Sequence, residues 1–305
     1  MRVGIGLPSA VSPADGRIVV EWAAAAENLG FGSVAVIDRL LAPTYDPLTV
    51  LAAAAAVTTR VELYTSVLLP ALRPTAVVAS QAATVDQLSG GRLSIGVGVG
   101  SRRVDYDAAG VAFERRGKVL DEQLSELRRV WQEPEDFRTP GPAPRRLGGP
   151  PIFVGGTSEA AVRRVIQHGS GWICGVGGAV AFAGTAETVR ERWQRAGRDG
   201  SPWLLSVVNY ALGANAADIA EGYLRRYYGE ATFLQSMIAQ IPTSLDSVRA
   251  ALDAHRQVGC DEVILLPCAS DQRQLELAAK VLSDDLTGPG LGRHVSRDQC
   301  SLCRW

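Results

Sequence analysis

The sequence predicts an α/β fold, a single (β/α)8 TIM barrel, and three observations support this fold class. Eight short apolar segments alternate with segments of helical periodicity along the chain. The two clearest strands are apolar on both faces, as strands of a parallel sheet covered by helices must be. The length of 305 residues suits one α/β barrel of about 250 residues with insertion loops at its carboxyl-terminal face.

Two strand and helix units open the chain. Their predicted bounds are Val3–Leu7 and Ser33–Ile37 for the strands, and Ile18–Leu29 and Pro47–Thr58 for the helices. The first helix carries an apolar stripe at three-to-four-residue spacing, and Gly30 ends it. The second strand ends at Asp38 and Arg39, which places two charged side chains at a strand end.

Residues 61–100 form the central βαβ unit. Strands over 61–70 and 92–100 flank a helix over 74–91, so the two strands must run parallel. Pro74 suits the first turn of the helix, and the glycines at 90 and 91 suit its end. Polar and small residues occur near the carboxyl ends of both strands, where a parallel α/β fold presents its ligand. They are Thr65, Ser66, Gly96, Gly98 and Gly100.

Two longer connections interrupt the alternation. Residues 101–117 are polar and follow the fourth strand, so we expect a long loop at the ligand-binding end. Residues 133–151 are rich in proline and glycine, a composition that is also typical of a linker between domains. We interpret them as a surface crossover because the alternation of strands and helices resumes beyond them.

The second half of the chain supplies the remaining strands. They are Ile152–Val154, Gly171–Cys174, Leu204–Val208 and Glu262–Leu266. The predicted helices are Lys118–Trp131, Ser158–His168, Ala186–Gly197, Ala216–Tyr228, Ser244–Val258 and Gln272–Leu282. Periodicity is lost from Thr287 onward. We therefore expect a barrel domain over residues 1–286 and a flexible C-terminal tail over 287–305.

Composition limits the kinds of partner. The formal net charge is −1 and charged residues make up 21% of the chain, so no broad basic field is available for nucleic acid or an anionic membrane. No apolar run reaches the roughly 18 residues of a membrane span, and no signal-peptide pattern precedes the first strand. Five scattered cysteines argue against a disulfide scaffold. We expect a cytoplasmic protein that binds a small molecule.

Two glycine motifs suggest a bound cofactor. The stretch Gly96–Gly100 departs from the G-x-G-x-x-G dinucleotide fingerprint, because Ser101 stands where the third glycine should be. Small residues there would instead let a flat ring lie against the strand ends. The stretch Gly155–Ala161 follows a strand and opens a helix, where backbone N–H groups with Thr157 and Ser158 can bind phosphate. The alternative for this second motif is an ordinary Ser/Thr N-cap.

Few other side chains suggest chemistry. His168, His255 and His294 are too dispersed to indicate a metal centre, and we assign structural roles to the first two. Asp38 ends a strand on the ligand face, where a carboxylate can bind a ligand or move a proton. The alternative is an aspartate that caps a helix or forms an ion pair.

With these residues in place, the chain resembles the bacterial luciferase-like superfamily of flavin-dependent oxidoreductases. The similarity runs through about residues 1–283. It is carried by GFGSVAVIDRL, TVDQLSGGRLSIGVGVG, IFVGGTSEAAVRRV and GCDEVILLP, of which the second is the most specific. The resemblance implies the same barrel, with reduced FMN or the deazaflavin F420 across the carboxyl ends of the strands.

The resemblance also implies which residues hold the cofactor. A non-prolyl cis peptide that supports the flavin ring is expected between Ser66 and Val67. Arg39 would offer a cation to an anionic substrate or to the phosphate side of the cofactor. The expected catalytic residues are Asp38 and Arg39, and the expected cofactor-binding residues are Asp38, Thr65, Ser66, Val67, Gly98, Gly100, Ser101, Gly155, Gly156, Thr157, Ser158 and Gly175. No metal is expected.

The implied activity is oxygenation of a small organic substrate by reduced FMN and O₂. A separate flavin reductase would supply the FMN, because the chain has no NAD fingerprint. One alternative is an F420-dependent oxidoreductase that transfers hydride without O₂. Another is a non-catalytic flavin-binding protein, since Arg39 and Ser101 replace the histidine and tryptophan common in relatives. The resemblance further implies a homodimer through helices near the second and third strands, where Ala52–Ala56 would permit close approach.

The tail carries His294, Cys300 and Cys303. A structural zinc site normally needs four ligands, and a redox C-x-x-C normally opens a helix within a βαβ unit. The tail offers neither arrangement. We therefore predict that it is dispensable for flavin binding and activity.

Overall fold

The strands of the protein close on themselves in chain order. The computed structural model describes residues 1–11, 15–132, 139–175, 177–229 and 232–284. Within it, eight parallel strands form a closed barrel in the order β1 to β8, and β8 pairs with β1. The strands are β1 Arg2–Gly6, β2 Ser33–Val36, β3 Glu62–Leu68, β4 Leu93–Val97, β5 Ile152–Gly155, β6 Gly171–Cys174, β7 Trp203–Tyr210 and β8 Glu262–Pro267.

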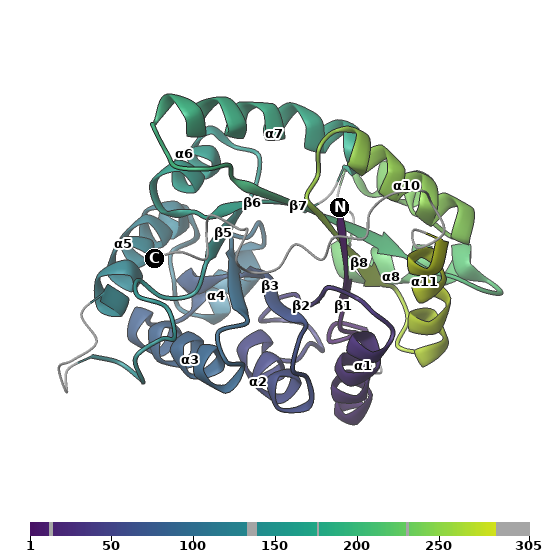
Figure 1. Ribbon diagram of the computed structural model, residues 1–305, viewed down its shortest axis with the longest axis horizontal. Coiled ribbons are helices and arrows are strands. Elements are labelled where there is room, and N and C mark those ends of the chain that lie inside the picture. Colours follow the sequence, from purple (N-terminus) through teal and green to yellow (C-terminus); the bar gives the residue numbers. More distant parts are fainter. Residues whose placement is uncertain (12–14, 133–138, 176, 230–231, 285–305) are drawn as a thin grey trace.

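Helices surround the strands, and Figure 1 shows this outer ring. Its members, each packed against the next, are α1 Gly16–Asn28, α2 Pro47–Val57, α3 Thr75–Leu88, α5 Arg116–Gln132, α6 Glu159–His168, α7 Gly178–Arg195, α10 Leu245–Gln257 and α11 Gln272–Asp284. Additional helices at the strand ends are α4 Arg103–Ala108, α8 Ala216–Tyr228 and α9 Leu234–Gln240, with 3₁₀ turns at Pro70–Leu72 and Phe113–Arg115. The predicted (β/α)8 fold class is confirmed.

Three helical segments differ from the sequence prediction. Helix α7 begins at Gly178 rather than at Ala186, because Phe182 packs on Trp172 with ring centroids 5.3 Å apart. The expected loop over 101–117 contains α4, where the buried Tyr106 donates its hydroxyl to the Val99 carbonyl at 2.6 Å. Helix α9 was not predicted. In each case tertiary packing orders a segment whose sequence has no clear period.

The hydrophobic core has two layers. Between the strands and the ring of helices lies a large cluster that includes the fully buried Trp22, Trp131 and Trp172. A smaller cluster fills the inside of the barrel, where the Tyr64 and Phe153 rings meet edge to face at 5.6 Å. The barrel is therefore a packed core rather than a pore.

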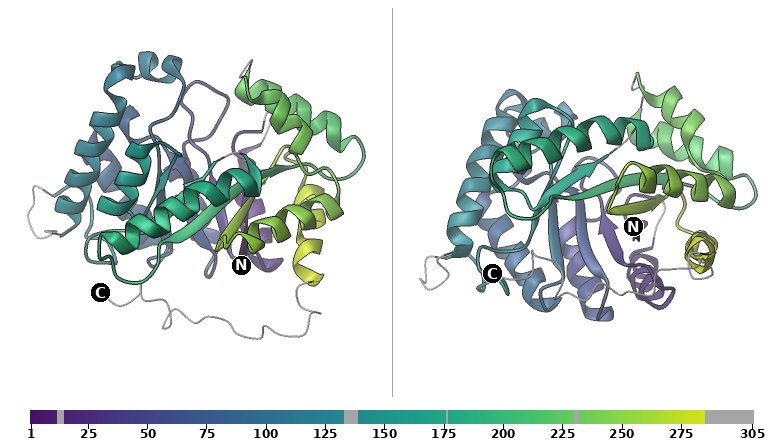
Figure 2. Two further views of the ribbon diagram at one scale, coloured as in Figure 1. Left: turned by 90° about the horizontal axis from the view of Figure 1, so that it is seen from above. Right: turned by 45° about the horizontal axis from the view of Figure 1, so that its top comes forward.

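An ion pair closes the amino end of the barrel. Arg2 donates to Glu262 through Nε at 2.8 Å and through Nη2 at 2.5 Å, and the same Nη2 reaches the Tyr64 hydroxyl at 2.9 Å. The Ser33 hydroxyl donates to the other Glu262 oxygen at 2.5 Å. A Cβ at Gly4 would lie 2.0 Å from the Ser33 hydroxyl, so glycine is required there. The opposite, carboxyl end carries α4 and α8 above the strands (Figure 2, left).

Candidate functional site

A cavity of about 730 Å³ opens at the carboxyl ends of the strands. This size falls within the range of about 300–1,000 Å³ that is typical of small-molecule and cofactor sites. Its lining residues are Ile37, Asp38, Arg39, Ser66, Val67, Leu69, residues 98–106, Gly155, Gly156, Ile173, Gly175, Val207, Asn209, Tyr223, Tyr227, Tyr228, Phe233 and Leu266. Strands β2 to β8 and helices α4 and α8 thus converge on one site, as expected from the sequence for a ligand at this face.

The floor of the cavity is the cis peptide between Ser66 and Val67. This predicted feature is confirmed, and the pairing of β3 with β4 shifts register across it. The Val67 side chain lies over glycines of the two next strands: an added Cβ would come within 2.8 Å of it at Gly98 and 3.2 Å at Gly155. Larger residues at these two positions would displace Val67 from the floor.

Two observations on this floor fit a flat polar cofactor. The Ser66 hydroxyl is buried without a hydrogen-bond partner among the described residues. An unpaired buried hydroxyl is unfavourable unless a ligand or water pairs with it, so Ser66 suits the polar edge of a ring. Gly175 lines the same cavity, and a Cβ built there would meet nothing within 4 Å. The residues present therefore fit a flavin-type ring.

Asp38 lies in the wall of the cavity and is held in an ion pair. One carboxylate oxygen accepts from Arg73 Nη1 at 2.6 Å and from the Leu69 backbone N–H at 2.9 Å, and the other accepts from Arg73 Nη2 at 3.0 Å. Arg73 also reaches Asp46 at 3.0 Å. The pKa of Arg73 is raised, because its bonds to Asp38 and Asp46 outweigh the desolvation that lowers it. Whether Asp38 also acts on a cofactor stays a prediction.

Thr65 does not lie where the sequence analysis expected it. Its side chain is fully buried, its hydroxyl donates to the Gly96 carbonyl at 2.7 Å, and it does not line the cavity. Direct contact with a cofactor is therefore excluded in this conformation. The reason is the alternation of side chains along β3, which turns Thr65 away from the face that presents Ser66.

The predicted phosphate-binding turn lies at the rim. Gly155 and Gly156 line the cavity, and Trp172 fixes the turn by donating Nε1 to the Gly156 carbonyl at 2.7 Å. Thr157 and Ser158 are exposed and stand outside the cavity lining. Ser158 caps α6 by accepting from the Ala161 N–H at 3.2 Å. The geometry suits both an N-cap and an anion at the helix start, so phosphate binding stays a prediction.

Sequence reasoning missed part of the wall. Arg102 lines the cavity next to the predicted Ser101, and Tyr227 and Tyr228 lie at the end of helix α8. The helix itself was predicted, but its apolar pattern does not indicate that the last turn faces the cavity. The sequence feature that could have pointed to Arg102 is the pair of consecutive arginines, Arg102 and Arg103, directly after the predicted Ser101.

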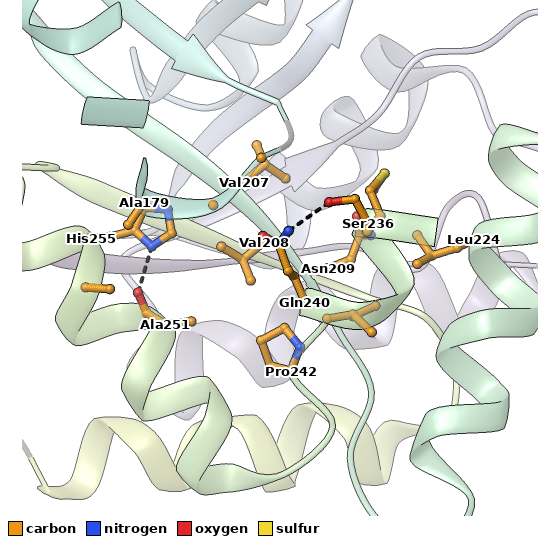
Figure 3. Close-up of a pocket in the computed structure, with 15 residues that line it drawn as sticks. Ala179, Val207, Val208, Asn209, Leu224, Ser236, Gln240, Pro242, Ala251 and His255 are labelled. Atoms are coloured by element: carbon orange, nitrogen blue, oxygen red, sulfur yellow. Dashed lines mark hydrogen bonds between the residues drawn. The ribbon is translucent and has the colours of Figure 1, made fainter. Parts of the chain in front are cut away.

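A smaller cavity of about 140 Å³ adjoins the main one through the shared residues Val207 and Asn209 (Figure 3). Its polar groups bond to one another: Gln240 donates to Ser236 at 2.8 Å. His255 contacts the Ala251 carbonyl at 2.7 Å and the Ser206 hydroxyl at 3.0 Å, and burial lowers its pKa. These contacts give His255 the structural role expected of it, and leave mainly apolar surface in the small cavity.

The part of the chain that the structure describes contains no group of three His, Cys, Asp or Glu side chains that suits a metal ion. None of its helices combines the length and apolar character needed to cross a membrane. The predicted tail, with His294, Cys300 and Cys303, lies outside the described residues.

Comparison with known sequences gives one family. The sequence profile of luciferase-like monooxygenases matches residues 1–262. An uncharacterised protein of Mycobacterium tuberculosis is 32% identical over 186 residues, or 58% of this chain and 66% of that relative. The pyrimidine monooxygenase RutA of an Enterobacter species is 30% identical over 176 residues, or 52% of this chain and 48% of that protein. The matches thus span less than two thirds of these relatives.

Two solved structures have the same fold. The monooxygenase RslO1 from Streptomyces bottropensis superposes with a TM-score of 0.74 at 23% identity, covering 94% of this chain and 100% of that one. An F420-dependent secondary alcohol dehydrogenase in complex with an F420–acetone adduct gives a TM-score of 0.75 at 19% identity, covering 92% and 97%. Both cover nearly the whole barrel.

Proposed function

Because the chain belongs to the luciferase-like monooxygenase family, we propose that it oxygenates a small organic substrate with reduced FMN and O₂. The observation that carries this proposal is the floor of the large cavity. There the Val67 side chain and the unpaired Ser66 hydroxyl offer an apolar surface with one polar group at the carboxyl ends of the strands. Bound reduced FMN would supply two electrons, so that one atom of O₂ enters the substrate and the other leaves as water.

The residues of the chain would hold this cofactor in defined ways. Val67 would support the ring from below, and the Ser66 hydroxyl would hydrogen-bond its polar edge. The α6 start at Gly156 and Ser158 would bind the phosphate through backbone N–H groups. The pair of Asp38 with Arg73 would keep the ends of β2 and β3 together beside the ring.

The choice of FMN rests on the fold shared with the oxygenating constituent of a Type II Baeyer–Villiger monooxygenase from Pseudomonas putida, which was solved in complex with FMN. RutA and RslO1 are described as monooxygenases, which supports an oxygen-dependent reaction. A second candidate is F420-dependent hydride transfer, because the fold is equally similar to that of an F420-dependent alcohol dehydrogenase. A separate flavin reductase and a homodimer remain parts of the proposal that the sequence analysis supports.

The cofactor proposal is tested by anaerobic titration. The purified protein is mixed separately with chemically reduced FMN and reduced F420, and binding is followed by the change in absorbance. We expect binding of reduced FMN, and loss of it in Val67→Asp, which places a charge on the floor. Tight binding of F420 with none of FMN would refute the cofactor choice.

The oxygen requirement is measured separately. The protein with reduced FMN is mixed with buffer that contains or lacks O₂ in the presence of a panel of small organic compounds, and products are identified by mass spectrometry. Incorporation of ¹⁸O from labelled O₂ is the expected result. Products formed equally well without O₂ would favour the hydride-transfer candidate instead.

A further inference from the structure

Two arginines meet in the wall of the large cavity. Arg39, in the loop that follows β2, donates Nη1 to the Tyr227 carbonyl at 2.5 Å. Arg102, at the start of α4, donates Nη1 to the same carbonyl at 2.8 Å. Both side chains line the cavity. A single neutral oxygen therefore serves two guanidinium groups.

The neighbouring acids are already engaged. Asp38 is paired with Arg73, and Asp105 accepts the Leu41 N–H at 2.8 Å. The closest approach of Asp105 to Arg102 is 4.0 Å, too long for a hydrogen bond. Among the described residues no carboxylate forms an ion pair with Arg39, which is only 9% exposed. Arg39 is thus not directly paired with an acid, and the ion pair of Arg102 with Asp105 is a distant one that lacks a hydrogen bond.

Both guanidinium groups retain unused hydrogen-bonding capacity. The Nε atoms of Arg39 and Arg102 are buried and have no hydrogen-bond partner among the described residues, although Arg102 Nε lies 4.0 Å from an Asp105 carboxylate oxygen. The pKa of Arg39 is lowered, first by burial and then by the charge of Arg102. An anion bound by both would relieve this repulsion and pair the free N–H groups, and guanidinium suits carboxylate and phosphate geometry.

Aromatic rings surround the arginines. The Arg39 guanidinium lies over the Tyr227 ring at 4.8 Å, and Tyr227 stacks on Tyr223 with ring centroids 5.8 Å apart. Tyr228 and Phe233, in contact at 5.5 Å, continue the wall. This surface suits an apolar or aromatic body attached to the anionic group.

We propose that Arg39 and Arg102 form an anion-binding subsite that selects substrates with a carboxylate or phosphate group on an apolar, preferably aromatic, body. This inference deepens the proposed function and rests on it for the identity of the ligand as substrate. The subsite is built from the loop after β2, the N-cap of α4 and the last turn of α8, whereas the expected cofactor phosphate position is the turn between β5 and α6.

The test is a calorimetric titration with defined probes. Benzoate and phenyl phosphate are the anions, and benzamide is the neutral compound of matching shape. Each is titrated into the protein with and without oxidised FMN. The variants are Arg102→Gln and Arg39→Gln, with thermal unfolding as the check on folding. Arg116→Gln is the matched control, because Arg116 stacks on Phe113 at 3.7 Å and does not line the cavity.

We expect the wild-type protein to bind at least one anion about tenfold or more tightly than benzamide. Arg102→Gln should lose that difference while keeping its affinity for benzamide, and Arg116→Gln should behave as wild type. Arg39→Gln should match Arg102→Gln if it folds. Equal binding of anions and benzamide, or no binding of either anion at millimolar concentration, would refute the subsite.

A second titration distinguishes substrate from cofactor as the source of the anion. FMN and riboflavin, which lacks the phosphate, are titrated into wild type and Arg102→Gln. Equal affinities of FMN for both proteins support the substrate assignment. Weaker FMN binding with unchanged riboflavin binding would assign the arginines to the cofactor phosphate and overturn the proposal. None of these titrations requires turnover, so their outcome is independent of the oxygen assay.

Discussion

Replacing Asp38 by asparagine separates its structural role from a role at the cofactor. Asparagine has the same shape but only one acceptor oxygen in place of two. Placed where Oδ2 of Asp38 lies, that oxygen can keep both the Leu69 N–H and Arg73 Nη1, so the ion pair is lost together with the charge-assisted hydrogen bond from Arg73 Nη2. Arg73 retains Asp46 at 3.0 Å and is not left unpaired.

The expected loss of stability follows from these contacts. A hydrogen bond to a charged group contributes about 1.5–3 kcal/mol, and breaking a buried pair outright costs about 3–5 kcal/mol. Because Asp46 still pairs with Arg73, we expect the lower value, about 2 kcal/mol. With an unfolding entropy of about 2.1 cal/mol/K per residue, this lowers Tm by about 3 °C in a chain of 305 residues.

The assay combines thermal unfolding with flavin binding and oxygen-dependent turnover. Asp38→Asn should remain folded and lose turnover by about tenfold or more. Asp46→Asn is the matched control: it removes the other acid of Arg73, caps α2 equally well as asparagine, and lies outside the cavity. Wild-type turnover in Asp38→Asn would refute a role at the cofactor and leave Asp38 as a purely ion-paired residue. An unchanged Tm would refute the energetic reasoning.

Four further predictions follow from the structure and the sequence. Gly175→Leu should weaken FMN binding about tenfold or more, because the new side chain fills open space in the cavity. Gly184→Leu, on the exposed side of α7, should bind FMN as the wild type does. Equal FMN titration curves for the two variants would contradict this prediction. The Glu27 carboxylate accepts the Thr59, Arg60 and Val61 N–H groups, and these bonds lower its pKa against the opposing effect of desolvation. The Glu27 carboxylate therefore stabilises the fold at pH values above its ordinary pKa of 4.5, and this stabilisation is lost as the pH falls below that value. The Tm of Glu27→Gln should consequently fall less steeply than that of the wild type as the solution is acidified. Sedimentation should give a dimer at micromolar concentration, and a monomer alone would contradict the dimer prediction. Deletion of the residues after Thr287 should leave FMN binding intact, and loss of bound zinc together with stability would show that the tail has a structural role.

Much of the fold could be predicted from the sequence because each signal was local. Strands such as Gly171–Cys174 and the helix Ala216–Tyr228 have the bounds that their apolar pattern predicted. The cis peptide at Ser66 and Val67 was also predicted, but from family resemblance rather than from local physics. The start of α7 was wrong because the buried contact of Phe182 with Trp172 has no counterpart in the pattern of the helix itself.

The chemistry of the cavity wall was decided by the tertiary structure. By itself, the sequence determined the barrel, the end at which ligands bind and the glycines that make room there, because hydrophobic periodicity and strand ends are properties of short segments. Only closure of the barrel brings Arg39 to the Tyr227 carbonyl, 188 positions away in the chain, and Arg102 to the same atom across 125 positions. It likewise pairs Asp38 with Arg73. Such contacts depend on the three-dimensional path of the chain, which no local pattern encodes.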